Sequence, residues 1–198
     1  MLPQNSYKLS DRPTIRNLEN ILKILDDVKP ILIGGMAVAA YANHYGLPYN
    51  RETKDIDFVI DKNEKIHTKE IIYKELQNLS IREGQIFGYD GMEITYKDGP
   101  KVSILFKDGE VPYNEIKLKL GKKEIKLYVA KMEYLFVDKI FTYLNRKERK
   151  DSEDIKVLYN LMKKYGYDKE LLYKIFSEYS KRYKKYSSKA KYIIEKIL

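Results

Sequence analysis

The sequence predicts an α+β fold, with a β-sheet and flanking helices in residues 1–130 and an α-helical domain in residues 131–198. Three observations support this division. Residues 31–60 follow the order strand, glycine pair, helix, loop, strand. Residues 81–129 contain short alternating segments separated by glycine-containing turns, and from residue 132 onward the apolar residues recur at helical spacing.

The first part of the chain alternates between helix and strand patterns. The predicted elements are an amphipathic helix at residues 14–27, a buried strand at 31–33, a helix at 36–43, a strand at 55–60 and a helix at 65–79. The strand at 31–33 is apolar and rich in β-branched isoleucine, and the glycine pair Gly34-Gly35 ends it. The small apolar residues that follow suit a helix packed closely on the sheet.

Short strands and turns are predicted between residues 81 and 129. The predicted turns are Asp90-Gly91, Asp98-Gly99-Pro100 and Asp108-Gly109, and the predicted strands cover residues 92–96, 102–106, 115–120 and 124–129. The last two strands alternate between apolar and charged residues, which predicts a hairpin with one solvated face.

The C-terminal part carries a helical pattern throughout. Helices are predicted at residues 133–144, 151–165, 168–183 and 187–198. Asp151 and Asp154 form a cap-like D-x-x-D pattern at the start of the second helix, Gly166 stops that helix, and Asp168 is the predicted N-cap of the third.

Composition excludes several classes of protein. No run of 18 apolar residues exists, so no membrane span is predicted, and the N-terminal residues lack the apolar segment of a signal peptide. Cysteine is absent, which excludes a disulfide framework and a thiolate metal site. We therefore expect a cytoplasmic protein.

The net charge of the chain is +9, and its distribution is uneven. Residues 174–198 contain eight Lys or Arg residues against two Asp or Glu residues, a net charge of +6. Such a segment favours a polyanion such as RNA or DNA; the alternative is a solvated helix face in a lysine-rich protein. Interleaved tyrosines can stack on bases or pack between helices: Tyr173, Tyr179, Tyr183, Tyr186 and Tyr192.

Asp55 and Asp57 are the candidate metal ligands. Residues i and i+2 of a strand point to the same side, so we expect these two carboxylates to share one face of the sheet. Two like charges this close are unfavourable unless a cation lies between them. Mg²⁺ is commonly held by one or two carboxylates together with nucleotide phosphates. The glycine pair before them can bring backbone N–H groups close to a phosphate.

This arrangement resembles the nucleotidyltransferase-fold superfamily, whose signature is h-G-G/S, a helix, and D-h-D on the next strand. The R-x-T-x-D-I-D form at residues 51–57 is most similar to the abortive-infection (type IV toxin, AbiEii-like) nucleotidyltransferases. The resemblance covers roughly residues 30–160. It implies a nucleotidyltransferase-like mixed β-sheet with flanking helices, followed by a C-terminal α-helical bundle.

The resemblance also implies roles for individual residues. Asp55 and Asp57 would hold Mg²⁺, with Mn²⁺ as the alternative, while Gly34, Gly35 and Met36 would bind the triphosphate of an NTP.

Arg51 and Thr53 would contact phosphate or brace the aspartate pair, with a structural salt bridge as the alternative for Arg51. The helix around Lys139 resembles the family's helix with an inward lysine, which implies that Lys139 reaches the nucleotide phosphates and acts in catalysis together with Asp55 and Asp57.

The segment at residues 146–155 resembles the family's run of basic residues followed by two aspartates. The resemblance implies that Asp151 and Asp154 hold Lys139 or Arg146 by ion pairs.

One position departs from the family pattern. Members usually carry a third carboxylate on a neighbouring strand, where residues 102–106 place Ser103. Serine cannot act as a carboxylate ligand or as a general base. Three explanations remain open: Glu93 supplies the carboxylate if the strand register puts it beside Ser103, the enzyme works with one tightly held metal, or the protein has lost transfer activity.

The resulting functional expectation is Mg-dependent transfer of an NMP from an NTP to an acceptor hydroxyl. The basic C-terminal segment suggests RNA or tRNA as acceptor, and the resemblance suggests a toxin with an antitoxin partner. The alternatives are a degenerate member that binds nucleotide or a partner without turnover, and a nucleic-acid-binding module that uses the basic helices.

Overall fold

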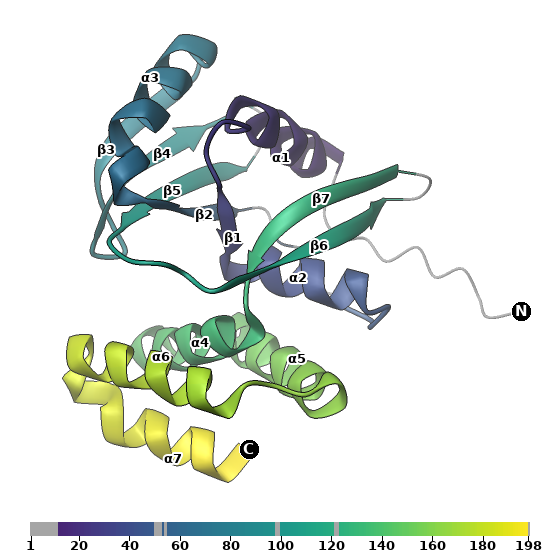
Figure 1. The fold of residues 1–198 in the computed structure, drawn as a ribbon, viewed down its shortest axis with the longest axis vertical. Coiled ribbons are helices and arrows are strands. Elements are labelled where there is room, and N and C mark those ends of the chain that lie inside the picture. The colour runs from purple at the N-terminus through teal and green to yellow at the C-terminus, as the bar shows by residue number, and fades with distance from the viewer. Residues whose placement is uncertain (1–11, 50–52, 54, 98–99, 121–122, 198) are drawn as a thin grey trace, which may run out of the picture. The chain divides into compact units, whose positions relative to one another are not determined.

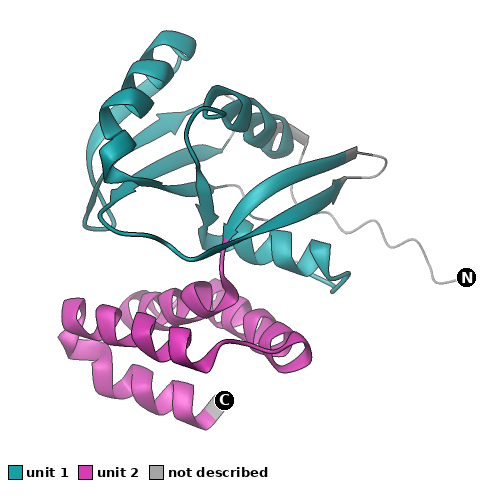
Figure 2. Cartoon of the chain, viewed as in Figure 1, with its two compact units in different colours: residues 1–129 teal, residues 130–198 magenta. Residues whose placement is uncertain are grey.

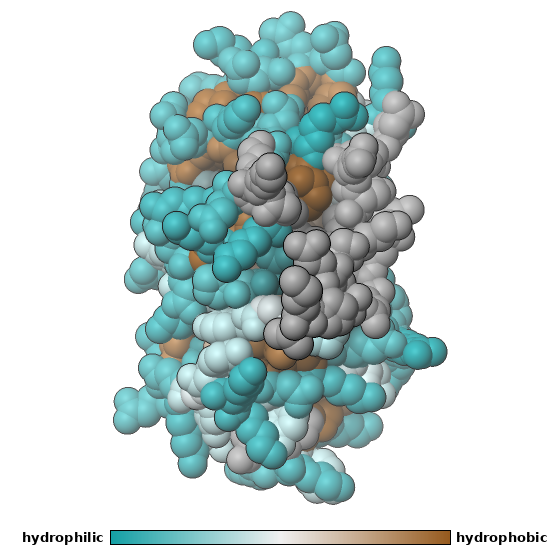
Figure 3. Space-filling view, turned by 90° about the vertical axis from the view of Figure 1, so that its right-hand side faces the viewer, coloured by the Kyte–Doolittle hydropathy of each residue, from teal (hydrophilic) through white to brown (hydrophobic). Residues whose placement is uncertain are grey.

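The computed structural model describes residues 12–49, 53, 55–97, 100–120 and 123–197. The chain divides into two compact units, Met1–Val129 and Ala130–Leu198 (Figure 2). The face drawn in Figure 3 is covered mostly by hydrophilic residues, with hydrophobic residues in smaller areas between them. Within the part of the chain that is described, no helix is long and apolar enough to cross a membrane.

Unit 1 is built on one mixed β-sheet of seven strands (Figure 1). Its elements in chain order are α1 (Arg12–Ile24), β1 (Ile31–Ile33), α2 (Gly34–His44), β2 (Ile56–Asp61), the 3₁₀ turn η1 (Lys62–Glu64), α3 (Lys65–Glu75), β3 (Ser80–Ile86), β4 (Tyr89–Thr95), β5 (Lys101–Lys107), β6 (Tyr113–Leu120) and β7 (Lys123–Ala130).

The strand order is β3-β4-β5-β2-β1-β7-β6. β2 pairs antiparallel with β1 and parallel with β5, and β1 pairs parallel with β7. Figure 1 shows α1 and α3 on one side of the sheet and α2 on the other. The predicted mixed sheet with flanking helices is therefore confirmed, although α3 ends at Glu75 rather than at residue 79.

The two sides of β2 differ in chemistry. On one side, a row of fully buried apolar side chains crosses four strands in register, from Leu32 through Phe58 and Ile104 to Met92. Hydrophobic burial of this row fixes which way β2 faces, because a slip by one residue would turn every side chain over. The neighbouring Asp57 must then project from the opposite side.

The predicted turn at Asp90-Gly91 is wrong. Both residues lie inside β4, and the turn is formed by Phe87 and Gly88, with φ values of +50° and +77°. Positive φ at both central residues is typical of a two-residue hairpin with the twist that strands prefer. Gly91 is needed for a different reason, since a Cβ there would lie 2.6 Å from the carbonyl oxygen of Ile104.

The hairpin predicted from the last two alternating strands is confirmed by β6 and β7. Its apolar residues are buried, namely Ile116, Leu118, Leu127 and Val129. Its charged residues form cross-strand ion pairs on the solvated side, with Nζ–Oε2 distances of 3.3 Å for Lys117 and Glu124 and 2.8 Å for Lys126 and Glu115.

Helix α2 covers the outer edge of β6. The Asn43 amide donates to the carbonyl of Lys119 (3.2 Å) and accepts from its backbone N–H (2.9 Å), and the Nδ1 atom of His44 lies 3.2 Å from the carbonyl oxygen of Lys117. These contacts occupy backbone groups that an edge strand otherwise exposes. They also fix α2 against the sheet, and with it the helix start that follows β1.

Unit 2 is helical, as predicted. It contains α4 (Met132–Arg146), α5 (Arg149–Tyr165), α6 (Lys169–Arg182), the 3₁₀ turn η2 (Lys184–Tyr186) and α7 (Ser187–Ile197). Gly166 ends α5 with a φ of +86°, and the Asp168 carboxylate caps α6 by accepting from the Leu171 N–H at 2.9 Å. The expected D-x-x-D cap of α5 is not formed, because α5 begins at Arg149, after Glu148.

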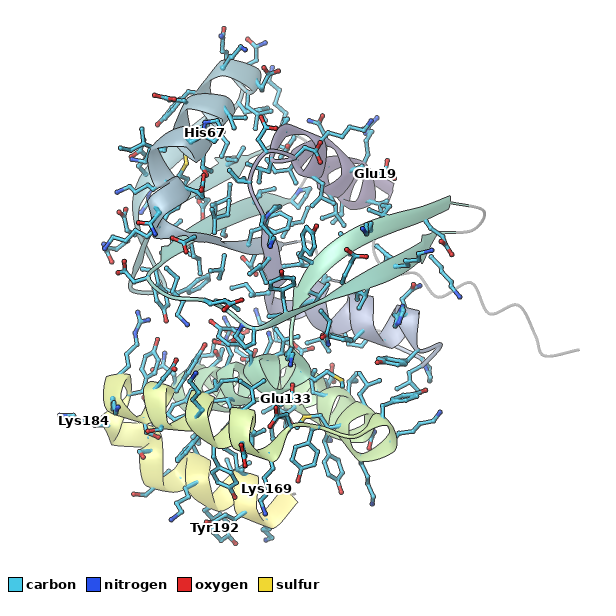
Figure 4. All side chains as sticks on the ribbon, viewed as in Figure 1. Glu19, His67, Glu133, Lys169, Lys184 and Tyr192 are labelled. Atoms are coloured by element: carbon cyan, nitrogen blue, oxygen red, sulfur yellow. The ribbon has the colours of Figure 1, made fainter. Side chains whose placement is uncertain are left out.

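Aromatic side chains fill the contact between α4 and α6. The ring of Phe141 lies 5.6 Å from that of Tyr179 and 5.8 Å from that of Tyr183, measured between centroids. These tyrosines therefore serve helix packing. Tyr192 is 62% exposed, and Figure 4 shows it projecting outward from α7 as Lys184 does from η2, so Tyr192 is still available for stacking.

Candidate active site

The junction between β1 and α2 brings Asp57 against Gly34. Ile33 is paired with Asp57 across the β1–β2 ladder. Gly34 has a φ of +70°, and a Cβ built on it would lie only 2.4 Å from the Oδ2 atom of Asp57. Glycine is therefore needed here both for its backbone conformation and for the space that the carboxylate fills.

The start of α2 has the properties of an anion site. Its N-cap residue is Ile33, and no side chain caps the first N–H groups. The helix dipole places partial positive charge at this end. Gly35 and Met36 are buried, the Met36 side chain completely, so any contact from these residues to a ligand comes from the backbone.

The two predicted carboxylates sit at the start of β2. Asp55 is exposed and directly precedes the strand, Asp57 is half-buried, and Ile56 between them is fully buried. Thr53 is 5% exposed. Arg51 lies outside the described residues.

Strand register places Glu93 beside Ser103. Asp57 pairs with Ser103 on β5, Ser103 pairs with Glu93 on β4, and Glu93 pairs with Arg82 on β3. Directly paired residues project to the same face, so these four share one side of the sheet, which we call the carboxylate face. Lys101 also lies on the carboxylate face, and its Nζ atom is 3.1 Å from the Oε1 atom of Glu93.

The carboxylate face does not reproduce the usual set of three acids. Adjacent strands lie about 4.8 Å apart, which puts the Glu93 backbone about 10 Å from that of Asp57. Among the described residues, no group of three or more His, Cys, Asp or Glu side chains could hold a metal. The chemistry present fits a hard cation held by Asp55 and Asp57 and completed by substrate phosphates.

Lys139 lies in unit 2 and is 4% exposed. Its Nζ atom is 2.9 Å from the Oδ2 atom of Asp154 and 3.7 Å from the Oδ1 atom of Asp151. Arg146 binds Asp151 through two hydrogen bonds of 2.7 and 2.8 Å. The predicted ion pairs of both aspartates are therefore confirmed, and they explain why these carboxylates point inward instead of capping α5.

Two carboxyl groups in unit 2 are shifted in opposite directions. Burial alone would raise the pKa of Asp151, but the hydrogen bonds and charge of Arg146, with the charge of Lys139, outweigh it and hold that pKa below its ordinary value. Burial raises the pKa of Asp138, despite the charge of Lys139 and a 3.0 Å hydrogen bond donated by the Tyr179 hydroxyl.

Sequence reasoning missed Lys101 and Arg82 as members of the carboxylate face. The period-two spacing from Ser103 to Lys101 was visible in the sequence. The pairing of Arg82 with Glu93 was not, because it depends on a turn whose position was predicted wrongly.

The fold and this glycine–carboxylate junction together define a nucleotidyltransferase-fold protein. Residues 18–197 match the family described as nucleotidyl transferase AbiEii toxin, type IV TA system. The chain therefore belongs to the AbiEii nucleotidyltransferase family of type IV toxin–antitoxin systems. No curated protein matches the sequence.

Solved structures share the fold at low sequence identity. The solution structure of the antibiotic-resistance factor ANT(2'')-Ia superposes with a TM-score of 0.60 at 13% identity, covering 90% of this chain and 97% of that one. An antigenic nucleotidyltransferase-like protein from Paracoccidioides brasiliensis has a TM-score of 0.49 at 19% identity, with 92% and 94% covered. The lincosamide antibiotic adenylyltransferase LnuA, with lincomycin bound, has a TM-score of 0.44 at 15% identity, with 75% and 96% covered.

Proposed function

We propose that this protein transfers a nucleoside monophosphate from an NTP to an acceptor hydroxyl in a Mg²⁺-dependent reaction. Unit 1 serves as the nucleotidyltransferase-like domain and unit 2 as the C-terminal helical domain. The observation that carries this proposal is the close approach of the Asp57 carboxylate to Gly34 at the uncapped start of α2. A phosphate-binding helix end and a metal-binding carboxylate are what phosphoryl chemistry needs side by side.

In this proposal the backbone N–H groups of Gly34, Gly35 and Met36 bind the triphosphate, and Asp55 and Asp57 hold the metal. Mg²⁺, or Mn²⁺ in its place, would neutralise phosphate charge when bound there. The acceptor oxygen forms a bond to the α-phosphorus, the bond from that phosphorus to the β-phosphate oxygen breaks, and pyrophosphate leaves with the electron pair.

Further residues support these groups in the proposal. Thr53, which is buried just before β2, braces the aspartate pair, and Arg51 contacts phosphate. Lys139 reaches the phosphates as a cation positioned by Asp151 and Asp154. A purely structural Lys139 is the alternative, since its charge is already matched by these two carboxylates.

Glu93 is proposed to supply the third carboxylate from β4, in place of the aspartate that Ser103 replaces. Register supports this assignment because Ser103 lies between Glu93 and Asp57 on the carboxylate face. Spacing requires that Glu93 act through its longer side chain or through a water molecule.

The proposed acceptor is RNA, with tRNA as one form. Charge supports a polyanion, because residues 130–198 contain 18 Lys or Arg against 10 Asp or Glu, whereas residues 1–129 contain 20 against 19. Family membership supports a toxin role in the cytoplasm with an antitoxin partner.

The test is incubation with each α-labelled NTP, Mg²⁺ or Mn²⁺, and total cellular RNA. Wild type should label RNA, and Asp55→Asn and Asp57→Asn should abolish labelling while retaining the melting temperature. Asp108→Asn is the matched control, because Asp108 is an exposed aspartate of unit 1 that pairs with Lys62. Labelling that survives in both strand variants would refute the metal assignment.

A second function is favoured by Ser103 specifically: a degenerate member that binds nucleotide, nucleic acid or a protein partner without turnover. It predicts that NTP raises the melting temperature although no NTP and acceptor combination gives transfer.

A further inference from the structure

Two cations bracket Glu93 on the carboxylate face. Lys101 reaches it diagonally from β5, and Arg82 stands directly opposite it on the edge strand β3. The Lys101 side chain is 55% exposed and that of Glu93 is 26% exposed. Arg82 is exposed and makes no ion pair with any other described residue.

The charges of this group do not cancel. One carboxylate between two cations leaves a net charge of +1 at the end of the carboxylate face away from Gly34. The opposite end carries Asp55 and Asp57 beside the start of α2. The face is therefore polarised across four strands, with its acidic end where the proposed metal and triphosphate bind.

We propose that Arg82 and Lys101 form a binding site for a phosphate group of the acceptor strand. This inference rests on the proposed function, in which the triphosphate occupies the α2 end. The Arg82 backbone lies three strand spacings from that of Asp57, or about 14 Å, so it is placed to meet the second substrate instead of the first. A guanidinium fork and an ammonium are the groups that bind phosphate oxygens in proteins.

Glu93 has a definite part in this site. Its carboxylate holds the Lys101 side chain over the sheet when no phosphate is present, and it competes with an incoming phosphate for the same ammonium. Removing the charge of Glu93 should therefore strengthen phosphate binding, which is the opposite of its effect on a metal-dependent step.

The test measures binding of a short single-stranded RNA oligonucleotide to the full chain by fluorescence anisotropy, without NTP and with EDTA, over a range of salt concentrations. The double variant Arg82→Gln/Lys101→Gln should bind more weakly. Its plot of log affinity against log salt should be shallower by about 1.4, because each phosphate contact to a single strand contributes about 0.7 to that slope.

The matched control is Lys117→Gln/Lys126→Gln. These lysines also lie on strands of unit 1, are 64% and 63% exposed, and pair with a carboxylate across the hairpin. Their replacement should leave the slope unchanged. An equal loss in both double variants would overturn the proposal, because it would show a general charge effect. Glu93→Gln should bind RNA more tightly than wild type, and weaker binding by this variant would also overturn it.

A second readout separates the two substrates. Thermal stabilisation by NTP and Mg²⁺ should be retained in Arg82→Gln/Lys101→Gln. Loss of that stabilisation with unchanged RNA affinity would assign the two cations to the nucleotide and overturn the proposal. Labelled transfer by wild type together with unchanged RNA binding by the double variant would refute this site alone. The predicted RNA binding without transfer would refute only the proposed function.

Discussion

Replacing Gly34 by alanine tests the junction on which the active site depends. Gly34 has a φ of +70°, a conformation that costs an L-residue about 1–2 kcal/mol. The new Cβ would also lie 2.4 Å from the Oδ2 atom of Asp57, closer than any carbon–oxygen contact allows. The carboxylate must therefore move away from the start of α2. We expect Gly34→Ala to lose nucleotidyl transfer while remaining folded.

Gly46→Ala provides the matched control for backbone strain. Gly46 has a φ of +66°, and a Cβ built there meets no atom within 4 Å. Both variants should lose the strain contribution, which lowers the melting temperature by about 2–4 °C per kcal/mol in a chain of this size. Only Gly34→Ala should show the additional loss from the displaced carboxylate.

The assays are thermal unfolding with and without NTP and Mg²⁺, and label transfer from α-labelled NTP. Gly46→Ala should keep both the nucleotide-dependent stabilisation and the transfer. If Gly34→Ala and Gly46→Ala had equal melting temperatures and equal transfer rates, the contact between Asp57 and Gly34 would have no functional weight and the reasoning would fail.

The remaining predictions concern unit 2. Asp168→Ala should lower the free energy of unfolding by about 1 kcal/mol, because α6 loses its N-cap; an unchanged urea midpoint would contradict this. Lys139→Met should cost about 3–5 kcal/mol, because it leaves Asp154 buried without its cation, and the same urea titration measures it. Asp151 has a lowered pKa in the folded state, so its contribution to stability is complete above the unfolded-state pKa of about 4 and is lost as the pH falls through the folded-state pKa. Arg146→Gln should therefore reduce the acid-induced loss of stability, as followed by melting temperature against pH; an unchanged acid profile would show that Arg146 does not set this pKa.

Local patterns in the sequence determined much of the fold and the centre of the site. Helices α4 to α7 follow from apolar residues at helical spacing, and the hairpin of β6 and β7 follows from strict alternation. The pairing of a glycine motif with Asp55 and Asp57 was also predictable, because covalent spacing along one strand decides which side chains share a face.

Only the tertiary structure decided how the strands meet. The register of β1 against β2 sets Asp57 against Gly34, and the register of β4 against β5 sets Glu93 beside Ser103. These registers depend on hydrogen bonds and packing between distant segments, which no local pattern specifies. The failed turn at Asp90-Gly91 shows the limit, since an Asp-Gly pair usually marks a turn, yet here the close backbone of β5 demands the glycine.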